Sequence, residues 1–357
     1  MGFLASLGYA TPFFQAPMAG GAVSPKMIAT LCQLGAMGSY AAGSNAPERI
    51  AKDLDEIRSY TSKPFLANFF VLPEAACGPA PYGMPTWLAK EYARCGAPAP
   101  QSFGPAAPTF REQFAAMGDN PPAAVSFSFG FPDKSVVVEL RKKGVFTLGV
   151  ANRPDEAVAW AGLGVNGVIA QSVAAGGHQG GPMPRSGRPE GPSTFELVRQ
   201  IAAETKAIDK GFAVVGAGGL MEGADIARCI EAGAEAAAMG TVFLTLRQSS
   251  ARPEHKMALL GQLGDRPSVF TRAFTGRWAR GIANEYMAAT ADLPDNLIPP
   301  YPALNAFTSP LRDHAAKKGD AERMSLWAGQ NFALCRDETA AELIDRTQTE
   351  YRAVAGV

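Results

Sequence analysis

Residues 167–181 read Gly167-Val168-Ile169-Ala170-Gln171-Ser172-Val173-Ala174-Ala175-Gly176-Gly177-His178-Gln179-Gly180-Gly181. The first four residues are small and apolar, which is typical of a buried strand. The strand runs into a segment in which four glycines surround one histidine, His178. Glycine permits close approaches and backbone angles that other residues avoid, and the imidazole pKa lies nearest to neutral pH. The stretch therefore indicates either a strand with a reactive loop or, equally well, a strand with an ordinary glycine-rich turn.

The same unit, a short apolar strand followed by a helix that ends in glycine, recurs through the first two thirds of the chain. Prolines open several of these helices, and glycines such as Gly164 and Gly233 follow their last turns. The predicted strands are 13–17, 36–40, 65–70, 124–129, 145–150, 167–171, 212–216 and 235–239. Eight such strands alternating with helices would suit an open doubly wound sheet or a (β/α)8 barrel of the TIM type. The count of eight and the glycines after the strands favour the barrel.

Two segments interrupt this alternation. Residues 71–123 are rich in proline and glycine, with helices expected near 86–95 and 109–117, and we interpret them as an insertion after the third strand. Residues 246–320 follow the eighth strand and predict a smaller lid or substrate-binding domain. Helices expected near 321–331 and 337–354 would complete the barrel wall. The predicted division is therefore a barrel of residues 1–245 and 321–357, with a lid of residues 246–320.

Composition excludes several classes of function. Lys plus Arg equals Asp plus Glu at 33 each, so no bulk charge favours nucleic acid or an acidic membrane surface. No apolar run approaches the roughly 18 residues of a membrane span, and the N-terminus lacks a basic signal region. The five cysteines form no CxxC pair, and no His or carboxylate cluster predicts a metal site. We expect a cytoplasmic protein with no metal.

Glycine pairs follow the last two predicted barrel strands. Gly218 and Gly219 come after the seventh strand, and Gly240 and Thr241 come after the eighth. In TIM-type barrels, backbone N–H groups at these two positions commonly hold a phosphate. Ordinary tight turns are the alternative, but two adjacent loops of this kind favour a phosphate site.

Polar or small residues end three other strands. Met18 and Gly20 follow the first strand, where small residues would let the backbone pass close to a flat ligand. Asn68 and Gln171 are polar in strands that should be buried, so each needs a hydrogen-bond partner. A ligand or a neighbouring strand end could supply it.

The remaining histidines and the arginine-rich segment have less specific interpretations. His255 and His314 lie in charged, helical surroundings and are predicted to be surface residues. The arginines of residues 272–281 could bind an anion, but a solvated or ion-paired lid segment is the favoured interpretation. No GxSxG motif or readable Ser-His-Asp arrangement is present.

With these motifs assembled, the chain resembles the class I nitronate monooxygenases, formerly called 2-nitropropane dioxygenases. The resemblance extends over nearly the whole chain, through residues 16–21, 64–70, 126–132, 174–180, 216–219, 239–241, 274–277, 284, 301–302 and 326–330. The AGGH and AGG–GT pieces are also similar to FMN-dependent enoyl-ACP reductases and a quinone reductase group. Two positions depart from the family pattern: Ser128 replaces a frequent histidine, and Ala238 a frequent glutamine.

The resemblance implies an FMN-binding barrel enzyme that oxidises alkyl nitronates with O₂ to a carbonyl compound and nitrite, without a nicotinamide. It implies His178 as the catalytic residue, with Phe129 and Tyr301 against the substrate. The cofactor contacts that it implies are Met18, Ala19, Gly20, Asn68, Gln171, Gly176, Gly177, Ala217, Gly218, Gly219, Met239, Gly240 and Thr241. His178 would remove a proton from a neutral nitroalkane or orient and neutralise an anionic nitronate.

Two other functions compete with this interpretation. One is an NAD(P)H-dependent FMN reductase that acts on an enoyl thioester or a quinone. The other is a cofactor-free barrel lyase or isomerase that holds a sugar phosphate in the phosphate site. The partners expected are a small nitro compound or nitronate and O₂, with no nucleic acid and no membrane, and the oligomeric state is left open.

Overall fold

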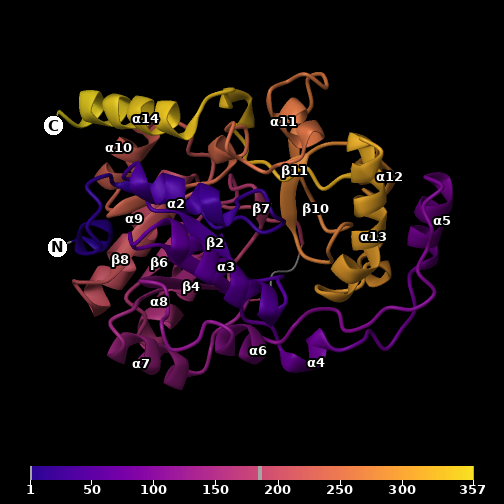
Figure 1. Ribbon diagram of the computed structural model, residues 1–357, viewed down its shortest axis with the longest axis horizontal. Coiled ribbons are helices and arrows are strands. Elements are labelled where there is room, and N and C mark those ends of the chain that lie inside the picture. Colours follow the sequence, from indigo (N-terminus) through magenta and orange to yellow (C-terminus); the bar gives the residue numbers. More distant parts are fainter. Residues whose placement is uncertain (1, 184–186, 357) are drawn as a thin grey trace.

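The computed structural model describes residues 2–183 and 187–356, which form an α/β barrel with a second unit at its mouth (Figure 1). Within these residues, eight parallel strands lie in the order β1-β9-β8-β6-β5-β4-β3-β2. They are β1 (Phe13–Gln15), β2 (Ser39–Ala41), β3 (Leu66–Phe70), β4 (Ala124–Ser128), β5 (Phe146–Ala151), β6 (Gly167–Gln171), β8 (Ala213–Ala217) and β9 (Ala236–Met239). The predicted TIM-type barrel is confirmed, and each strand overlaps its predicted range.

The barrel closes at the seam between β1 and β2 through a side chain. Only a single parallel bridge, Phe14 to Met37, joins the two strands among the described residues. Gln15 seals the remaining gap, because its Oε1 accepts the Ser39 N–H at 2.8 Å and its carbonyl accepts the Ser39 hydroxyl at 2.5 Å. Strand β2 starts at residue 39 rather than 36, since the residues before it make this bridge instead of a full ladder.

The barrel wall is built from α2 (Pro25–Gln33), α3 (Pro47–Tyr60), α7 (Lys134–Lys142), α8 (Pro154–Leu163), α9 (Thr194–Ile208), α10 (Gly223–Glu231) and α14 (Ala340–Ala355), with the short α1 (Phe3–Ser6) at the N-terminus. The residues predicted to begin and end these helices do so in the structure. Pro25, Pro47 and Pro154 occupy first helical positions, and Ser24 Oγ caps α2 by accepting the Met27 N–H at 3.2 Å. Gly164 ends α8 with φ 92°, a conformation that favours glycine.

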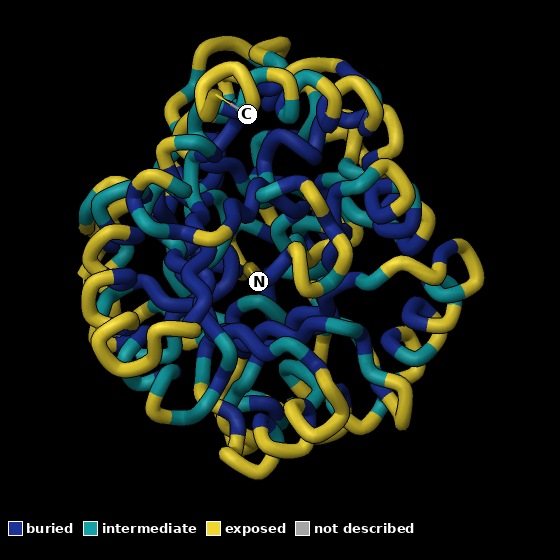
Figure 2. The backbone as a smooth tube through the Cα atoms, turned by 90° about the vertical axis from the view of Figure 1, so that its left-hand side faces the viewer, coloured by how far each residue is buried: buried dark blue, intermediate teal, exposed yellow. Residues whose placement is uncertain are grey.

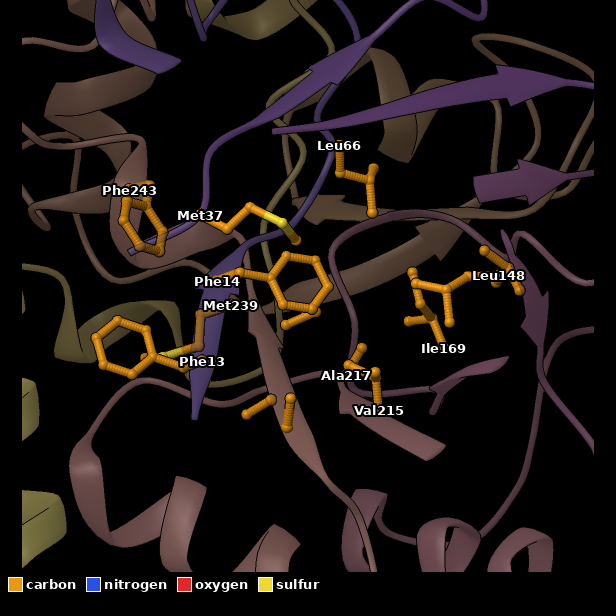
Figure 3. Close-up of a cluster of buried hydrophobic side chains, with 14 of the residues drawn as sticks. Phe13, Phe14, Met37, Leu66, Leu148, Ile169, Val215, Ala217, Met239 and Phe243 are labelled. Carbon is orange, nitrogen blue, oxygen red and sulfur yellow. The ribbon is translucent and has the colours of Figure 1, made fainter. Parts of the chain in front are cut away.

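The barrel interior is filled by apolar side chains from the strands (Figure 3). Phe14, Met37, Leu66, Leu148 and Val215 are fully buried there. Between sheet and helices the fit is close enough to demand glycine: a Cβ at Gly149 of β5 would lie 2.1 Å from Cδ2 of Trp160 on α8. The buried residues of the barrel surround its centre, and the exposed residues form its rim (Figure 2).

A second unit lies beside the barrel mouth (Figure 1). Residues 246–320 contain α11 (Pro253–Leu259), β10 (Ser268–Thr271), β11 (Ala279–Ile282), α12 (Glu285–Ala289), the 3₁₀ turn Asp295–Leu297 and α13 (Ala303–Lys317). Residues 71–123 contain α4 (Glu74–Cys77), α5 (Thr86–Arg94) and α6 (Phe110–Ala115). The last two agree with the two predicted helices, and the short α4 was not predicted. Leu88 and Tyr92 of α5 join Phe274, Tyr286 and Phe307 in a second apolar cluster, so the insertion and the 246–320 segment share one core.

The second unit contains strands that the sequence did not reveal. Among the described residues, β10, β11 and β7 (Gly177–His178) form a small antiparallel sheet, with Ala279 opposite His178. The histidine loop after β6 is thus an edge strand of this sheet. The strand signal was missed because β7 has two residues and β11 consists of Ala-Arg-Gly-Ile, which lacks any alternating pattern.

The helix predicted for residues 321–331 is wrong. The segment forms the 3₁₀ turn Ala321–Arg323, an extended stretch, and the 3₁₀ turn Phe332–Leu334. The extended stretch runs along β11, because the Ile282 N–H donates to the Leu326 carbonyl at 2.8 Å and the Ala328 N–H to the Arg280 carbonyl at 3.2 Å. Pairing with β11 therefore replaces the helical hydrogen bonds. In the part of the chain that the structure describes, no helix is long and apolar enough to cross a membrane.

Candidate active site

A cavity of about 570 Å³ lies between the carboxyl ends of the barrel strands and the second unit. Its floor is formed by the loops after the strands, which is where TIM-type barrels carry their chemistry. The lining brings together nearly all of the residues singled out in the sequence: Met18, Ala19, Gly20, Asn68, Phe129, Gln171, Gly176, Gly177, His178, Ala217, Gly218, Gly219, Gly240, Thr241 and Tyr301.

Met239 is the predicted contact that lies elsewhere. It does not line the cavity, and its side chain is buried in the barrel core beside Phe13 (Figure 3). Its backbone carbonyl accepts the Ala16 N–H at 2.8 Å, which joins β9 to the end of β1. Met239 thus helps to shape the cavity floor only through the backbone.

His178 lies in an aromatic box at the cavity wall. The centroid of its ring is 5.6 Å from Phe129, 5.6 Å from Tyr301 and 5.7 Å from Trp327. Burial, with the positive charges of Arg277 and Arg312, lowers the pKa of His178 to about 3. The imidazole is therefore neutral at pH 7 in the free protein.

The hydrogen bonds of Thr275 assign the tautomer of this imidazole. Nε2 of His178 is 2.9 Å from the Thr275 hydroxyl oxygen, which in turn donates to the Arg277 carbonyl at 3.1 Å. We assign the tautomer from this network: with the single hydroxyl proton given to that carbonyl, Nε2–H is the donor to Thr275. Nδ1 is then the nitrogen that is free to accept a proton or a hydrogen bond.

A polar network fixes the loop that carries His178. Gln171 accepts the Gly180 N–H at 2.8 Å through Oε1 and donates to the His178 carbonyl at 3.0 Å through Nε2. Asn152, at the end of β5, donates to Gln171 Oε1 at 2.9 Å and accepts the Gly181 N–H at 2.6 Å. Gln171 lines the cavity as predicted, but its amide is occupied by protein partners, and it acts first as a brace for His178.

A buried carboxylate completes this network. Glu156, in the first turn of α8, accepts the Asn152 N–H at 2.6 Å and the Met183 N–H at 3.2 Å. Burial raises its pKa. On the other side of the loop, the Arg277 guanidinium donates to the carbonyls of Gln179 and Gly181 at 2.9 and 2.5 Å. Glu156 and Arg277 thus hold backbone groups of residues 179–183 in place.

Phe129 is held in a conformation that is uncommon for a bulky residue. Its φ is 75°, in the left-handed region, and its N–H donates to the Gly180 carbonyl at 2.8 Å. Its ring contacts Phe70 and Tyr301 and lies 4.3 Å below the Arg277 guanidinium. Strain of this kind persists only where the surroundings enforce it, and here it presents the Phe129 ring to His178.

The amide nitrogen of Asn68 is hydrogen-bonded to side chains of the neighbouring strand β4. Its Nδ2 donates to the Ser126 hydroxyl at 2.9 Å and to the Ser128 hydroxyl at 3.1 Å. Oδ1 accepts from no described protein group and belongs to a residue that lines the cavity. The two positions that depart from the family pattern, Ser128 and Ala238, line the cavity as well, where they leave more room than histidine and glutamine would.

The loops after β8 and β9 form a cradle of backbone. Gly218 and Gly219 have φ 120° and 67°, and a Cβ at Gly218 would lie 2.4 Å from the Ser172 Oγ. Their N–H groups donate to no acceptor within the described residues. Helix α10 does not contribute its N-terminus, because Glu222 and Glu350 already accept N–H groups of its first turn. The available amides are those of the two glycine loops.

Several interpretations of the basic residues require correction. His255, expected at the surface, lines the cavity and donates through Nε2 to the Trp327 carbonyl at 3.0 Å, and burial lowers its pKa to about 4. His314 is only half-exposed, and its Nε2 is buried. Of the arginines in residues 272–281, Arg272 is ion-paired with Asp295, as expected for a lid segment. Arg277 and Arg280 are instead half-buried, and they donate to backbone carbonyls.

The structure also brings residues into the site that sequence reasoning missed. Thr275 lay inside a recognised motif but had no assigned role. Asn152 directly follows β5, and Gln171 is the last residue of β6, so the position of Asn152 at a strand end was a usable signal. Arg312 on α13 lines the cavity from a helix whose sequence carries no sign of a site.

Comparisons with known proteins agree with this geometry. The family model for nitronate monooxygenase matches residues 3–349. The nitronate monooxygenase of Paraburkholderia phytofirmans is 34% identical over 97% of this chain and 93% of its own length. That of Pseudomonas aeruginosa is 34% identical over 98% and 99%.

Solved structures give the same result. The nitroalkane oxidase from Streptomyces ansochromogenes superimposes with a TM-score of 0.86 at 36% identity, covering 99% of this chain and 98% of that one. FabK from Thermotoga maritima, at 21% identity, 98% and 95% coverage and a TM-score of 0.74, shares the fold. The chain belongs to the nitronate monooxygenase family of oxidoreductases.

Proposed function

We propose that the protein binds FMN and oxidises alkyl nitronates with O₂ to a carbonyl compound and nitrite, without a nicotinamide. The observation that carries this proposal is the position of His178. Its neutral ring faces the same cavity as the glycine loops after β8 and β9. A phosphate cradle and a reactive imidazole on one cavity suit a flavin with a small substrate against it.

The residues present fit FMN. Gly218 and Gly219 offer N–H groups with no protein acceptor in the described chain, which suits a phosphate. Gly240 and Thr241 lie at the adjacent strand end, and the Thr241 hydroxyl already accepts the Gly329 N–H at 2.9 Å. This contact fixes the hydroxyl oxygen beside the cradle and leaves its proton for a phosphate oxygen.

A flat ring would be held by the residues that follow β1, which pairs with β9, and by Asn68 of β3. Met18, Ala19 and Gly20 supply small or flexible surface after β1, and Asn68 Oδ1 supplies an acceptor for a ring N–H. Gly176 lines the cavity and packs closely on the Ala328 backbone, since a Cβ at this position would lie 2.6 Å from it. The absence of a side chain leaves a flat backbone surface for the ring. When bound, FMN supplies electron transfer between the nitronate and O₂.

His178 is better suited to holding an anion than to removing a proton from carbon. With a pKa near 3 in the free protein, its imidazole is a weak base for a neutral nitroalkane. A bound nitronate brings its own negative charge, which raises the pKa of a neighbouring imidazole. It thereby favours protonation of Nδ1, whose N–H then donates to a nitronate oxygen. We therefore infer that nitronates are the preferred substrates and that Phe129, Tyr301 and Trp327 exclude water around them.

We further propose that residues 246–320 act as the substrate-binding domain. This segment supplies Thr275, which orients His178, and Tyr301 and Arg312, which line the cavity. The barrel supplies the residues assigned to the cofactor. This division places the cofactor and the substrate on opposite walls of one cavity.

Anaerobic mixing tests the proposal. The purified protein should carry FMN, and ethyl nitronate should bleach its visible absorbance rapidly, whereas NADH and NADPH should not. Rapid bleaching by NADH and none by the nitronate would favour a nicotinamide-dependent reductase. A colourless protein that takes up no FMN would remove the flavin assignment.

A further inference from the structure

Arg312 is a cation of the cavity wall that has no use in the function described so far. Arg312 lies on α13, is enclosed by protein, and keeps its residual exposure toward the cavity that it lines. Its Nη2 donates to the Asn305 Oδ1 at 2.7 Å and the Asn305 carbonyl at 3.2 Å, and its Nη1 lies 3.4 Å from the Ser325 hydroxyl. Its buried Nε has no partner in the described parts of the chain.

Arg312 has no counter-ion. Arg277 and Arg280 are also without an ion pair, but their Nε groups donate to the Gln179 and Val173 carbonyls, whereas the Nε of Arg312 has no partner in the described chain. Two other shielded arginines are ion-paired. Arg346 pairs with Glu338 at 2.8 Å and with Glu350 at 3.1 Å, and Arg323 pairs with Asp320 and Glu285 at 3.1 Å. No carboxylate of residues 2–183 or 187–356 lies within 4.0 Å of the Arg312 guanidinium. A buried charge without a partner destabilises the folded chain, so its retention at a cavity wall indicates a ligand that supplies the missing anion.

Its position assigns this anion to the substrate side of the cavity. The Arg312 charge acts on both His178 and Tyr301: it adds to the lowering of the His178 pKa by burial, and it opposes the rise that burial gives the pKa of Tyr301. The glycine loops proposed for the cofactor phosphate follow β8 and β9 of the barrel, whereas Arg312 belongs to the second unit. An anion at Arg312 therefore lies beside the residues that face the substrate.

The surface around Arg312 is polar over a length of helix. Asn305, Ser309 and Arg312 all line the cavity at a spacing of four and three residues, which places them on one face of α13. Ser325 faces them from the extended stretch along β11. These side chains offer hydrogen-bond donors to an oxyanion in the same cavity that His178 and Tyr301 line.

We propose that Arg312 is the anion-binding residue of the substrate site, and that its guanidinium pairs with an oxyanion group of the substrate. The inference rests on the proposed function and adds a residue that determines specificity. The oxyanion is either the nitronate group itself or a carboxylate at the other end of the substrate, and both would form the same charge-assisted hydrogen bonds. Neutral nitroalkanes without a carboxylate would bind poorly.

The test uses the flavin-loaded full chain with two substrates, ethyl nitronate and propionate-3-nitronate, of which only the second carries a carboxylate. Arg312→Gln should raise KM at least 30-fold for the substrate whose anion Arg312 holds, with a smaller effect on kcat. Arg312→Lys keeps the charge and should recover part of this loss. Lys317→Gln, which removes an exposed charge from the same helix, is the matched control and should leave KM within about twofold.

The two substrates separate the sources of the anion. A loss for both nitronates assigns Arg312 to the nitronate oxygens, and a loss for propionate-3-nitronate alone assigns it to the carboxylate. Unchanged KM for both substrates in Arg312→Gln would overturn the inference. Loss of bound FMN in that variant would also overturn it, because Arg312 would then belong to the cofactor site.

Isothermal titration calorimetry measures anion binding at Arg312 without turnover. Nitrate and butyrate are inert probes for the two anions, and at least one of them should bind to wild-type protein at least tenfold more tightly than to Arg312→Gln. If wild-type protein turned over neither nitronate, the proposed function would fail, yet this difference in binding would still support an anion site. Equal binding of both probes to the two proteins would overturn it.

Discussion

Thr275→Val isolates the contact that orients the candidate catalytic histidine. Valine matches threonine in shape, so the change removes the hydroxyl and little else. Thr275 is 2% exposed, so water does not readily replace the lost acceptor for Nε2–H of His178. Leaving a buried donor without a partner costs about 1–3 kcal/mol. The same hydroxyl accepts the Arg277 N–H at 3.3 Å, so the lid loop loses a contact too.

The variant should lower kcat/KM for ethyl nitronate by roughly 10- to 100-fold, since about 1.4 kcal/mol corresponds to a factor of ten. FMN content should be unchanged, because Thr275 lies on the substrate side. Oxygen consumption under steady-state conditions measures the first quantity, and absorbance of released flavin the second. Thr205→Val is the matched control: Thr205 is equally buried, but its hydroxyl donates within α9 at 2.7 Å to Ile201. Activity within twofold of wild type for Thr275→Val would refute the role assigned to this contact.

Three further predictions concern the barrel, the cradle and pH. Gly149→Ala should destabilise the protein by about 1–3 kcal/mol in urea unfolding, because the new methyl would overlap Trp160, and an unchanged midpoint would show that the sheet and helix can separate there. Gly219→Asp should reduce FMN retention, because it adds a carboxylate and a strained φ to the proposed phosphate cradle, and normal flavin content would remove that assignment. The lowered pKa values of His178 and His255 add stability that is complete above about pH 6.5 and is lost as the pH falls toward 4 and 3. The free energy of unfolding should therefore be lower at pH 5 than at pH 7.5 by about 2 kcal/mol per histidine. The decrease should be smaller in His255→Gln than in wild type, and an equal decrease would contradict the contribution assigned to His255.

The barrel was predictable because its signals are local. Each strand is a short apolar run, and each helix is bounded by a proline or serine at its start and a glycine such as Gly164 at its end. Residues at strand ends, including Asn68, Gln171 and Gly218, could be placed in one cavity because parallel strands in a barrel end on one face. The sequence did not show that alternation along β9 turns the side chain of Met239 into the core, so that only its backbone borders the cavity floor.

The second unit was less predictable because long-range pairing creates it. β11 becomes a strand through partners on both sides, β10 and β7, and residues 326–328 extend along it instead of forming a helix. The charged surroundings of His255 suggested the surface, yet α11 is packed over the cavity mouth and turns this side chain inward. Arg312 could not be predicted from the sequence for the same reason. Only the packing of α13 shows that its guanidinium is enclosed by protein without a neighbouring carboxylate.

Sequence motifs and geometry together narrow the role of His178. The sequence left two roles open, proton removal from carbon or stabilisation of an anion. The burial of its imidazole and the two neighbouring guanidinium groups favour the second role in the free protein. The network through Gln171, Asn152 and Glu156 then serves to keep the ring in place rather than to make it a stronger base.

Oxygen consumption with nitrite detection tests the central claim most directly. Flavin-loaded protein, supplied with ethyl nitronate and no nicotinamide, should consume O₂ and release nitrite, and His178→Asn should retain FMN but lose most of this turnover. Neutral nitroethane should react far more slowly than its nitronate. Oxygen consumption that requires NADH, or full activity in His178→Asn, would contradict the account.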